Sequence, residues 1–414
     1  MTRQHNRTRC ARLVAVYVAA WCCANLASAH PLVVRWSDLA TQATASSGYE
    51  EGLRAQAIAA LAAFDAVNAC ERRFRFYRRD LEDRASLPAG GACAAPGLIV
   101  ASAYTTVLSA LNSARADAAR AALADLAGAE PDADKREAAL AHGQAMGLEM
   151  LLLRVADRAD YSAAPLLPAG PGVFAPAPGR QPYSARASTW QPFALRPVAA
   201  HQPPPPPAPD TTTAQADLDE VRQLGAQTSQ QRSADQTAAA IYWNTLGAAD
   251  HAALRRPWLK AHGSSLVDAL RTRALFALVA VDSMVAESTW HWQFQRWRPQ
   301  QALAAQGLAD WVPLLTTPNG PEYPSGVAIW AGALGTLQAR LPAAQGTWPL
   351  AVTNSSSRAD APAHRQWPDA DTLSRDAAHS RLWAGVHTRG AVEAGLRAGR
   401  SIAEDILAHQ LLPR

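Results

Sequence analysis

Features typical of membrane proteins, nucleic-acid-binding proteins and cysteine-ligated metal proteins are largely missing from this sequence of 414 residues. No stretch beyond residue 29 is long and apolar enough to span a membrane. The formal net charge is only +4, which is too small a balance to indicate a nucleic-acid partner. We therefore expect no nucleic acid as a partner and no membrane span in the mature chain.

Cysteine is scarce, and three of the five cysteines lie in the first 29 residues. This segment begins with several arginines, continues with a short apolar run over 13–26 and ends in the small-residue triplet ASA. That order is typical of an export signal peptide. We expect cleavage before His30 and a periplasmic or secreted protein, with an uncleaved membrane anchor as the alternative.

Only Cys70 and Cys93 remain after such a cleavage. Exported chains with two cysteines often pair them, so we expect a disulfide that joins the end of one helix to the following loop. Two free thiols are the alternative. A cysteine-ligated metal site is not expected, because no Cys-x-x-Cys pair or histidine-rich partner accompanies them.

Long alternating runs, which would indicate an extended sheet, are also missing, whereas apolar residues recur every three or four positions over most of the chain. The Ala-rich segment 51–71 is a clear example of a helix with one buried face. We predict an all-α fold of helical bundles. The other predicted helices cover about 96–127, 134–158, 214–232, 234–246, 262–290, 324–341 and 376–410.

Proline and glycine concentrate in one irregular region, about 159–211, which includes five consecutive prolines at 203–207. Consecutive prolines favour an extended, semi-rigid conformation. We interpret this part as a linker between two helical halves, with a recognition ligand for a partner as the alternative. The predicted organisation is a signal peptide (1–29), an N-terminal half (30–200), a Pro-rich linker (201–213) and a C-terminal half (214–414).

Three short segments of the C-terminal half carry residues suited to binding an anion. HWQFQRWRP contains His291 and Arg298, with Arg298 just before a proline at which the helix is expected to end or kink. EYPSGV places Ser325 and Gly326 at a predicted helix N-terminus, where unpaired backbone N–H groups favour an anion. SRLWAGVHTRG contributes an arginine and a histidine on a helical or near-helical stretch.

The arginine and histidine of the third segment are Arg381 and His387. Two guanidinium groups bind a tetrahedral oxyanion through paired donors. An imidazole beside it can attack phosphorus or ligate the metal of an oxyanion. We therefore predict that Arg298, Ser325, Arg381 and His387 converge on one small anion.

The same segments resemble the motifs of the vanadium-dependent haloperoxidase family, which shares its site with the type 2 phosphatidic acid phosphatases. FDAVNA near residue 64, the five prolines and GAQTSQQRSADQTAAAIYW extend the resemblance to the bacterial branch over nearly the whole mature chain. The resemblance implies an oxyanion site that binds vanadate, or phosphate as a competing anion. It assigns this site to residues His291, Arg298, Ser325, Gly326, Arg381 and His387.

Within that resemblance, His387 corresponds to the vanadium ligand, or to the phosphohistidine of the phosphatases, and Arg298, Arg381 and His387 form the catalytic set. Asp282 is a weaker match to a supporting aspartate. Three positions depart from the motifs, since the family's lysine, histidine and aspartate are replaced by His291, Val327 and Ala391. Val327 lacks the acid–base group and Ala391 lacks the carboxylate that would orient the third-motif histidine. His379, Glu393 or His291 are candidates to replace a missing role.

Three functions follow as expectations. The first is a haloperoxidase-type oxidoreductase that uses peroxide to oxidise halide, made doubtful by the three substitutions. The second is a phosphatase or phosphotransferase acting on a phosphate ester through a phosphohistidine at His387. The third is a repurposed or non-catalytic oxyanion-binding protein.

Overall fold

The computed structural model describes residues 29–83, 88, 91–158, 166–183, 185, 187–260 and 265–414. The predicted signal peptide lies outside the described residues, except for Ala29 at its end. Helices dominate the described part of the chain, which confirms the predicted all-α fold. Its one sheet is an antiparallel pair of short strands, β1 (Leu350–Thr353) and β2 (His364–Trp367).

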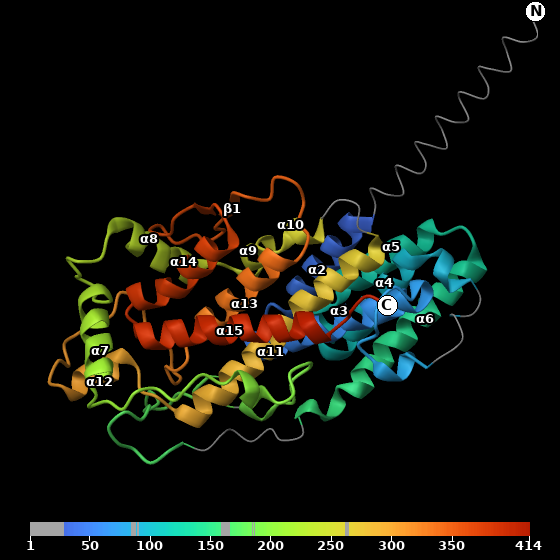
Figure 1. The fold of residues 1–414 in the computed structure, drawn as a ribbon. Helices are drawn as coiled ribbons and strands as arrows, with labels where there is room; N and C mark the ends of the chain where they lie inside the picture. The colour runs from blue at the N-terminus through green and yellow to red at the C-terminus, as the bar shows by residue number, and fades with distance from the viewer. Residues whose placement is uncertain are drawn as a thin grey trace, which may run out of the picture.

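The N-terminal helices gather at one end of an elongated molecule (Figure 1). Their sequences are rich in alanine, which has the highest helix propensity and whose small side chain lets neighbouring helices approach closely. Most side chains of the long helix α3 are buried. These helices are α2 (Ala29–Thr44), α3 (Tyr49–Glu71), α4 (Pro96–Leu111), α5 (Asp117–Ala129) and α6 (Ala133–Leu153).

The C-terminal helices form the other end, and α11 runs between the two groups (Figure 1). A capping box of Ser265 and Asp268 begins α11, and Gln295 in the left-handed region (φ 42°) ends it. The helix packs against α2 and α3 on one side and α13 and α15 on the other. The C-terminal helices are α7 (Thr212–Leu224), α8 (Ala234–Thr245), α9 (Ala248–Ala253), α10 (Arg256–Leu259), α11 (Leu266–Phe294), α12 (Pro299–Ala305), α13 (Gly326–Arg340), α14 (Ala370–Trp383) and α15 (Arg389–His409).

Three predicted helices are shorter than their apolar patterns. The pattern over 96–127 is interrupted by a 3₁₀ turn at Ser113–Arg115, and the pattern over 214–232 ends at Leu224. The pattern over 376–410 is broken between α14 and α15 by Gly385, whose φ is +80°. A Cβ atom at Gly385 would lie 2.4 Å from the carbonyl oxygen of Gly225, so this break requires glycine.

One hydrophobic core extends through both groups of helices, from Val33 in α2 to Leu411 near the C-terminus. The chain end also returns to the N-terminal helices, because the N–H of Arg75 donates to the carbonyl of Leu412 at 2.8 Å. The Pro-rich segment lies against the C-terminal half, where the hydroxyl of Tyr323 donates to the carbonyl of Pro204 at 2.6 Å. The predicted division at 201–213 stays a prediction, although the core is continuous across it.

Asp282 of α11 anchors the loop that leads toward this Pro-rich segment. Its carboxylate is fully buried and accepts hydrogen bonds from the N–H groups of Phe193, Ala194 and Leu195 at 2.6, 2.7 and 2.9 Å. Its pKa is raised to about 6, because the effect of burial exceeds the opposite effect of these three hydrogen-bond donors. Asp282 therefore holds the backbone of residues 193–195 in place. The resemblance had suggested instead that it supports the anion site.

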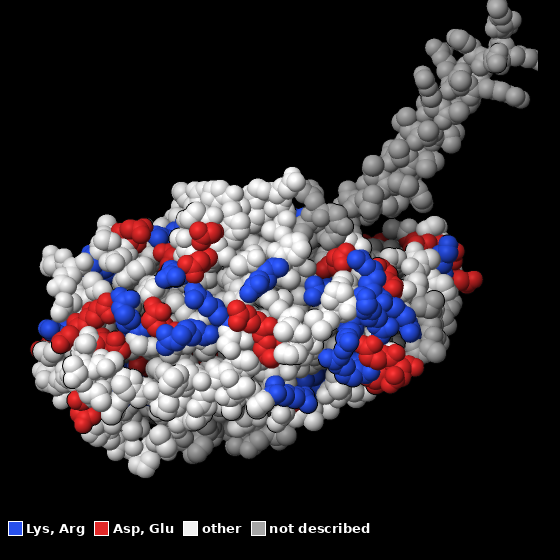
Figure 2. All heavy atoms as spheres, in the orientation of Figure 1, with Lys and Arg blue, Asp and Glu red and all other residues white. Residues whose placement is uncertain are grey.

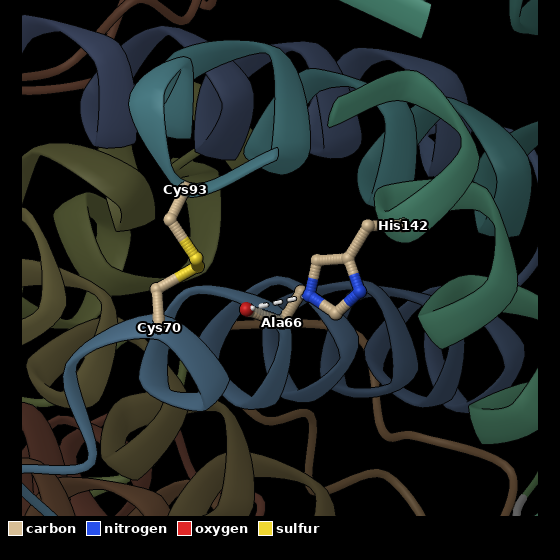
Figure 3. Close-up of a disulfide and its surroundings, with 4 residues drawn as sticks. All are labelled: Ala66, Cys70, Cys93 and His142. Atoms are coloured by element: carbon tan, nitrogen blue, oxygen red, sulfur yellow. Dashed lines mark hydrogen bonds between the residues drawn. A yellow bond between two sulfur atoms is a disulfide. The ribbon is translucent and has the colours of Figure 1, made fainter. Parts of the chain in front are cut away.

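The expected disulfide is present between Cys70 and Cys93 (Figure 3). It joins the last turn of α3 to the 3₁₀ turn Ala92–Ala94, just before α4. Nearby, His142 of α6 donates from Nε2 to the carbonyl of Ala66 in α3 at 2.9 Å. The disulfide and this hydrogen bond together fix the C-terminal end of α3 against its neighbours.

Acidic and basic side chains are interspersed on the face shown in Figure 2. Arg72, Arg73, Arg271 and Arg414 line a pocket together with Asp268. Arg73 is paired with Asp268 and Arg414 with Glu82, so much of this charge is compensated at the surface. No helix in the described ranges is both long and apolar enough to cross a membrane.

Candidate functional site

Arg298 lies at the centre of the site, on the short connection from α11 to α12. It is the N-cap of α12, so α11 ends four residues earlier and His291 and Arg298 do not share one helical face. The guanidinium is 1% exposed and donates to the carbonyls of Gly320 and Val386 at 2.7 and 3.0 Å. These two acceptors fix its plane without neutralising its charge.

His387 receives a further hydrogen bond from this guanidinium, with 2.9 Å between its Nε2 atom and a terminal nitrogen of Arg298. A guanidinium can only donate, so Nε2 is the acceptor and the neutral imidazole carries its hydrogen on Nδ1. Burial, followed by the charges of Arg298 and Arg381, lowers the pKa of His387 well below 6.5. The main chain of Glu322 opposes this shift. His387 is thus a neutral base whose Nε2 lone pair faces a cation.

Arg381 supplies the second guanidinium from the last turn of α14. One of its terminal nitrogens donates to the side-chain oxygen of Asn244 at 3.3 Å, and its Nε has no hydrogen-bond partner within the described part of the chain. Burial and the charge of Arg298 lower its pKa to about 10. Its main-chain carbonyl accepts from the N–H of His387 at 3.3 Å, because the chain turns between α14 and α15. His387 is therefore in a turn, whereas the spacing had suggested a near-helical stretch.

The predicted helix N-terminus is present, with Ser325 as the N-cap of α13 and Gly326 as its first residue. Ser325 is fully buried, and its hydroxyl makes no hydrogen bond to any residue that the structure describes. Its N–H donates to the carbonyl of Ala391 at 3.0 Å, which ties the turn to the first residues of α15. Val327 follows on the first turn and is half-buried. An unpartnered buried hydroxyl beside a helix N-terminus is the expected arrangement for a site that binds an anion.

His291 occupies the position of the family's lysine and is fully buried. Its Nε2 lies 2.6 Å from the carbonyl oxygen of Pro324 and must donate to it, so Nδ1 bears the lone pair. Burial and the charge of Arg298 lower its pKa to about 3. A neutral imidazole in this tautomer can accept a hydrogen from a protonated oxyanion or peroxide, but it cannot replace the positive charge of a lysine.

Two residues of the site carry no motif signal in the sequence. Tyr183, from the long irregular region, accepts a hydrogen bond from Arg298 at 2.6 Å, and its ring packs edge-on against His291. Glu287, one turn before His291 on α11, has a carboxylate oxygen 3.8 Å from the Nδ1 atom of His291. Burial raises the pKa of Glu287 to about 7. A Cβ atom at Gly326 would lie 2.0 Å from Glu287, so glycine is required for the carboxyl to approach α13.

The other candidate replacements do not join this cluster. His379 binds Glu393 through Nε2 at 2.9 Å and the carbonyl of Arg375 through Nδ1, so both nitrogens are engaged. Ala391, at the position of the family's aspartate, is fully buried against Tyr323. No described side chain takes the place of the missing carboxylate beside His387.

The donors of this cluster fit a tetrahedral oxyanion. Among the described residues, neither Arg298 nor Arg381 has a carboxylate within 4.0 Å, although both are buried. Buried cations without a paired anion are costly unless a ligand supplies the negative charge. The hydroxyl of Ser325 and the Nε of Arg381 are buried and unpartnered, which leaves hydrogen bonds for that ligand. Vanadate and phosphate both have this charge and shape.

In the described ranges, no three histidine, cysteine or acidic side chains gather as they would around a metal ion. A cavity of 440 Å³ is lined by Trp297, Glu322 and Thr388 among other described residues, but not by Arg298, Arg381 or His387.

Comparison with known proteins agrees with the motifs. Residues 274–412 match the family described as the VCPO second helical-bundle domain. A bacterial vanadium-dependent iodoperoxidase is similar in structure, with a TM-score of 0.78 and 18% identity over 92% of this chain and 97% of that one. No curated protein matches the chain in sequence.

The holo form of a bacterial vanadium-dependent chloroperoxidase has a TM-score of 0.69 and 16% identity, covering 88% of this chain and 94% of that one. Its apo form has a TM-score of 0.67 and the same identity, covering 86% and 93%. These matches support the predicted family: residues 274–412 match the VCPO second helical-bundle domain, and the chain has the fold of bacterial vanadium-dependent haloperoxidases.

Proposed function

We propose that this chain is an exported oxyanion-binding protein of the vanadium haloperoxidase type, with vanadate as the cofactor and phosphate as its competitor. The observation that carries the proposal is that two buried guanidiniums, neither paired with a carboxylate among the described residues, both act on the neutral imidazole of His387. The disulfide between Cys70 and Cys93 supports export, since such bonds persist in oxidising compartments.

The chain's own residues would hold and orient the anion. Arg298 and Arg381 neutralise the oxygens, Ser325 and the first N–H groups of α13 donate to them, and His387 offers its Nε2 lone pair. When bound, vanadate would supply a Lewis acid for the oxidation of halide by peroxide. His291 is placed to accept a hydrogen from a protonated oxygen, because its only donor is committed to Pro324.

The missing acid–base group limits the expected rate. Val327 removes a role that typically contributes about 10²–10⁴-fold, and His291 carries no charge at neutral pH. Glu287 supports a second candidate, a phosphotransferase, because a carboxyl with a pKa of about 7 beside the helix N-terminus could protonate a leaving oxygen. In that reaction Nε2 of His387 would form the bond to phosphorus as the leaving oxygen departs with the proton.

Binding and activity can be tested separately. Calorimetric titration with orthovanadate and with phosphate measures binding, and bromination of a phenol with peroxide and bromide measures oxidation. We expect binding of both anions, competition between them and slow oxidation only with vanadate. Arg298→Gln and His387→Ala should abolish these signals, while the exposed controls Arg222→Gln and His409→Ala retain them. Absence of anion binding in the unaltered protein would refute the proposal.

Variants at the same site distinguish the second candidate function, phosphotransfer, from halide oxidation. Hydrolysis of a chromogenic phosphate ester, lost in His387→Ala and reduced in Glu287→Gln, would favour phosphotransfer. Anion binding without either activity would identify a repurposed binding protein and would contradict the oxidoreductase role.

A further inference from the structure

The cavity of 440 Å³ is not lined by Arg298, Arg381 or His387 and has its own set of polar groups. It lies between α7, α12, the Pro-rich segment and the start of α15. This volume is within the range of small-molecule sites, which are mostly apolar with a few convergent polar groups. Its lining includes Pro171, Pro206, Pro207, Pro209, Ala214, Gln215, Leu218, Trp297, Pro299, Ala302, Ala305 and Tyr323.

Arg296 is the cation of this cavity, and among the described residues its guanidinium has no hydrogen bond and no ion pair. The backbone around it is well fixed: its carbonyl accepts from Glu322 at 2.8 Å, and Val173 pairs with it in an isolated bridge. The guanidinium carbon lies 6.0 Å from the ring centroid of Trp297. Arg296 is thus held at the cavity wall with its donors unused.

Two carboxylates face the same space, each with one oxygen engaged. Asp217 of α7 accepts from the N–H of Gly390 through Oδ2 at 3.0 Å. Glu322, which is 3% exposed, accepts from the N–H and hydroxyl of Thr388 through Oε1 at 2.6 and 2.7 Å. The other oxygen of each carboxylate makes no hydrogen bond to a described residue. Both groups interact with Arg296 electrostatically, yet neither comes within salt-bridge distance of it.

Opposite charges are therefore arranged around an open space without pairing across it. A ligand that carries a carboxylate and an ammonium could satisfy the guanidinium and the carboxylates at once. The apolar part of that ligand would lie between Trp297 and the prolines, which are held in place by the hydrogen bond from Tyr323 to Pro204. A ligand with only one charge would leave at least one of these groups desolvated and unpaired, which is costly.

We infer that this cavity binds a small zwitterion of the α-amino acid class with an aromatic or aliphatic side chain. Its carboxylate pairs with Arg296, and its ammonium pairs with the free oxygens of Asp217 and Glu322. The site does not include Arg298, Arg381 or His387, so its occupancy does not depend on the proposed vanadate function. Burial raises the pKa of both carboxyl groups, and an incoming ammonium would lower it again.

L-Phenylalanine is a suitable probe, with phenethylamine and 3-phenylpropionate as analogues that each lack one charge. Calorimetry on the full chain should give saturable binding of phenylalanine and at least about tenfold weaker binding of each analogue, the loss expected for one unpaired charged hydrogen bond. Binding of either analogue as tightly as phenylalanine would overturn the zwitterion assignment.

Variants then assign each charge to its residue. Arg296→Gln should weaken phenylalanine about tenfold and leave phenethylamine unchanged, and Asp217→Asn should weaken phenylalanine while sparing 3-phenylpropionate. Ala305→Phe, an exposed position on the lining that tolerates a larger residue, should block all three by filling the cavity. Arg222→Gln on the same helix as Asp217 is the matched control. No binding of any probe at millimolar concentration, or binding unaffected by both Arg296→Gln and Ala305→Phe, would refute the inference.

Discussion

The Nε2 atom of His387 accepts a hydrogen bond from the buried guanidinium of Arg298 at 2.9 Å, so the lone pair of the motif histidine is occupied by the motif arginine. An incoming anion must displace this hydrogen bond before the imidazole can act on it. The exchange is favourable because the anion offers Arg298 a charged acceptor in place of a neutral one. Binding of the anion to Arg298 therefore also releases the lone pair on Nε2 of His387.

The buried His291 makes stability sensitive to acid. Its pKa is lowered to about 3 in the folded state, so between pH 6.5 and 3 the unfolded chain binds more protons and stability falls as pH decreases. A single buried histidine of this kind changes the free energy of unfolding by at most about 1.4 kcal/mol per pH unit. His291→Gln, which keeps a donor for Pro324 but does not titrate, should flatten this part of the profile. Urea unfolding across the pH range provides the comparison, and parallel curves for the two proteins would contradict it.

Val327→His restores the acid–base group at a half-buried position on the first turn of α13. A well-placed group contributes about 10²–10⁴-fold, so a gain of about tenfold or more is expected in vanadate-dependent oxidation or in phosphate-ester hydrolysis. Val327→Leu is the control and should show no gain. Equal activity of the two variants would mean that position 327 no longer faces the bound anion.

Asp282 should contribute strongly to stability, because its carboxylate is the only described acceptor for three backbone N–H groups, two of them buried. Asp282→Ala leaves these donors without a partner, at about 1–3 kcal/mol each. Asp282→Asn retains one oxygen and should have an intermediate effect. Urea unfolding measures both, with the exposed Asp310→Ala as control. A loss below about 1 kcal/mol in Asp282→Ala would show that water or rearranged backbone replaces the carboxylate.

The disulfide should stabilise the N-terminal helices without affecting anion binding. The bonded cysteines are separated by 23 residues, for which loop closure gives about 3 kcal/mol. The double variant Cys70→Ser/Cys93→Ser should unfold at a lower temperature, and reductant should lower the melting temperature of the unaltered protein only. Phosphate binding should be equal in both proteins. A difference in binding would mean that the constraint on α3 reaches the C-terminal site.

The sequence alone determined the fold class, the family motifs and most helix positions, because helical periodicity and short motifs are local properties of the chain. Segment 51–71 is an example, since its apolar spacing marks almost the whole of α3. The breaks that the pattern missed arise from packing: Gly385 ends the 376–410 pattern because another backbone lies 2.4 Å from its missing Cβ atom.

The chemistry of the site was decided by the tertiary structure. The sequence named His291, Arg298 and His387, but their tautomers and charges follow from a carbonyl, a neighbouring guanidinium and burial, which no motif encodes. Tyr183 and Glu287 reach the site from segments without any motif, and the charges around the second cavity come from positions far apart in the chain. Hydrogen bonds and desolvation act between residues that meet only after folding, so they cannot be read from spacing along the chain.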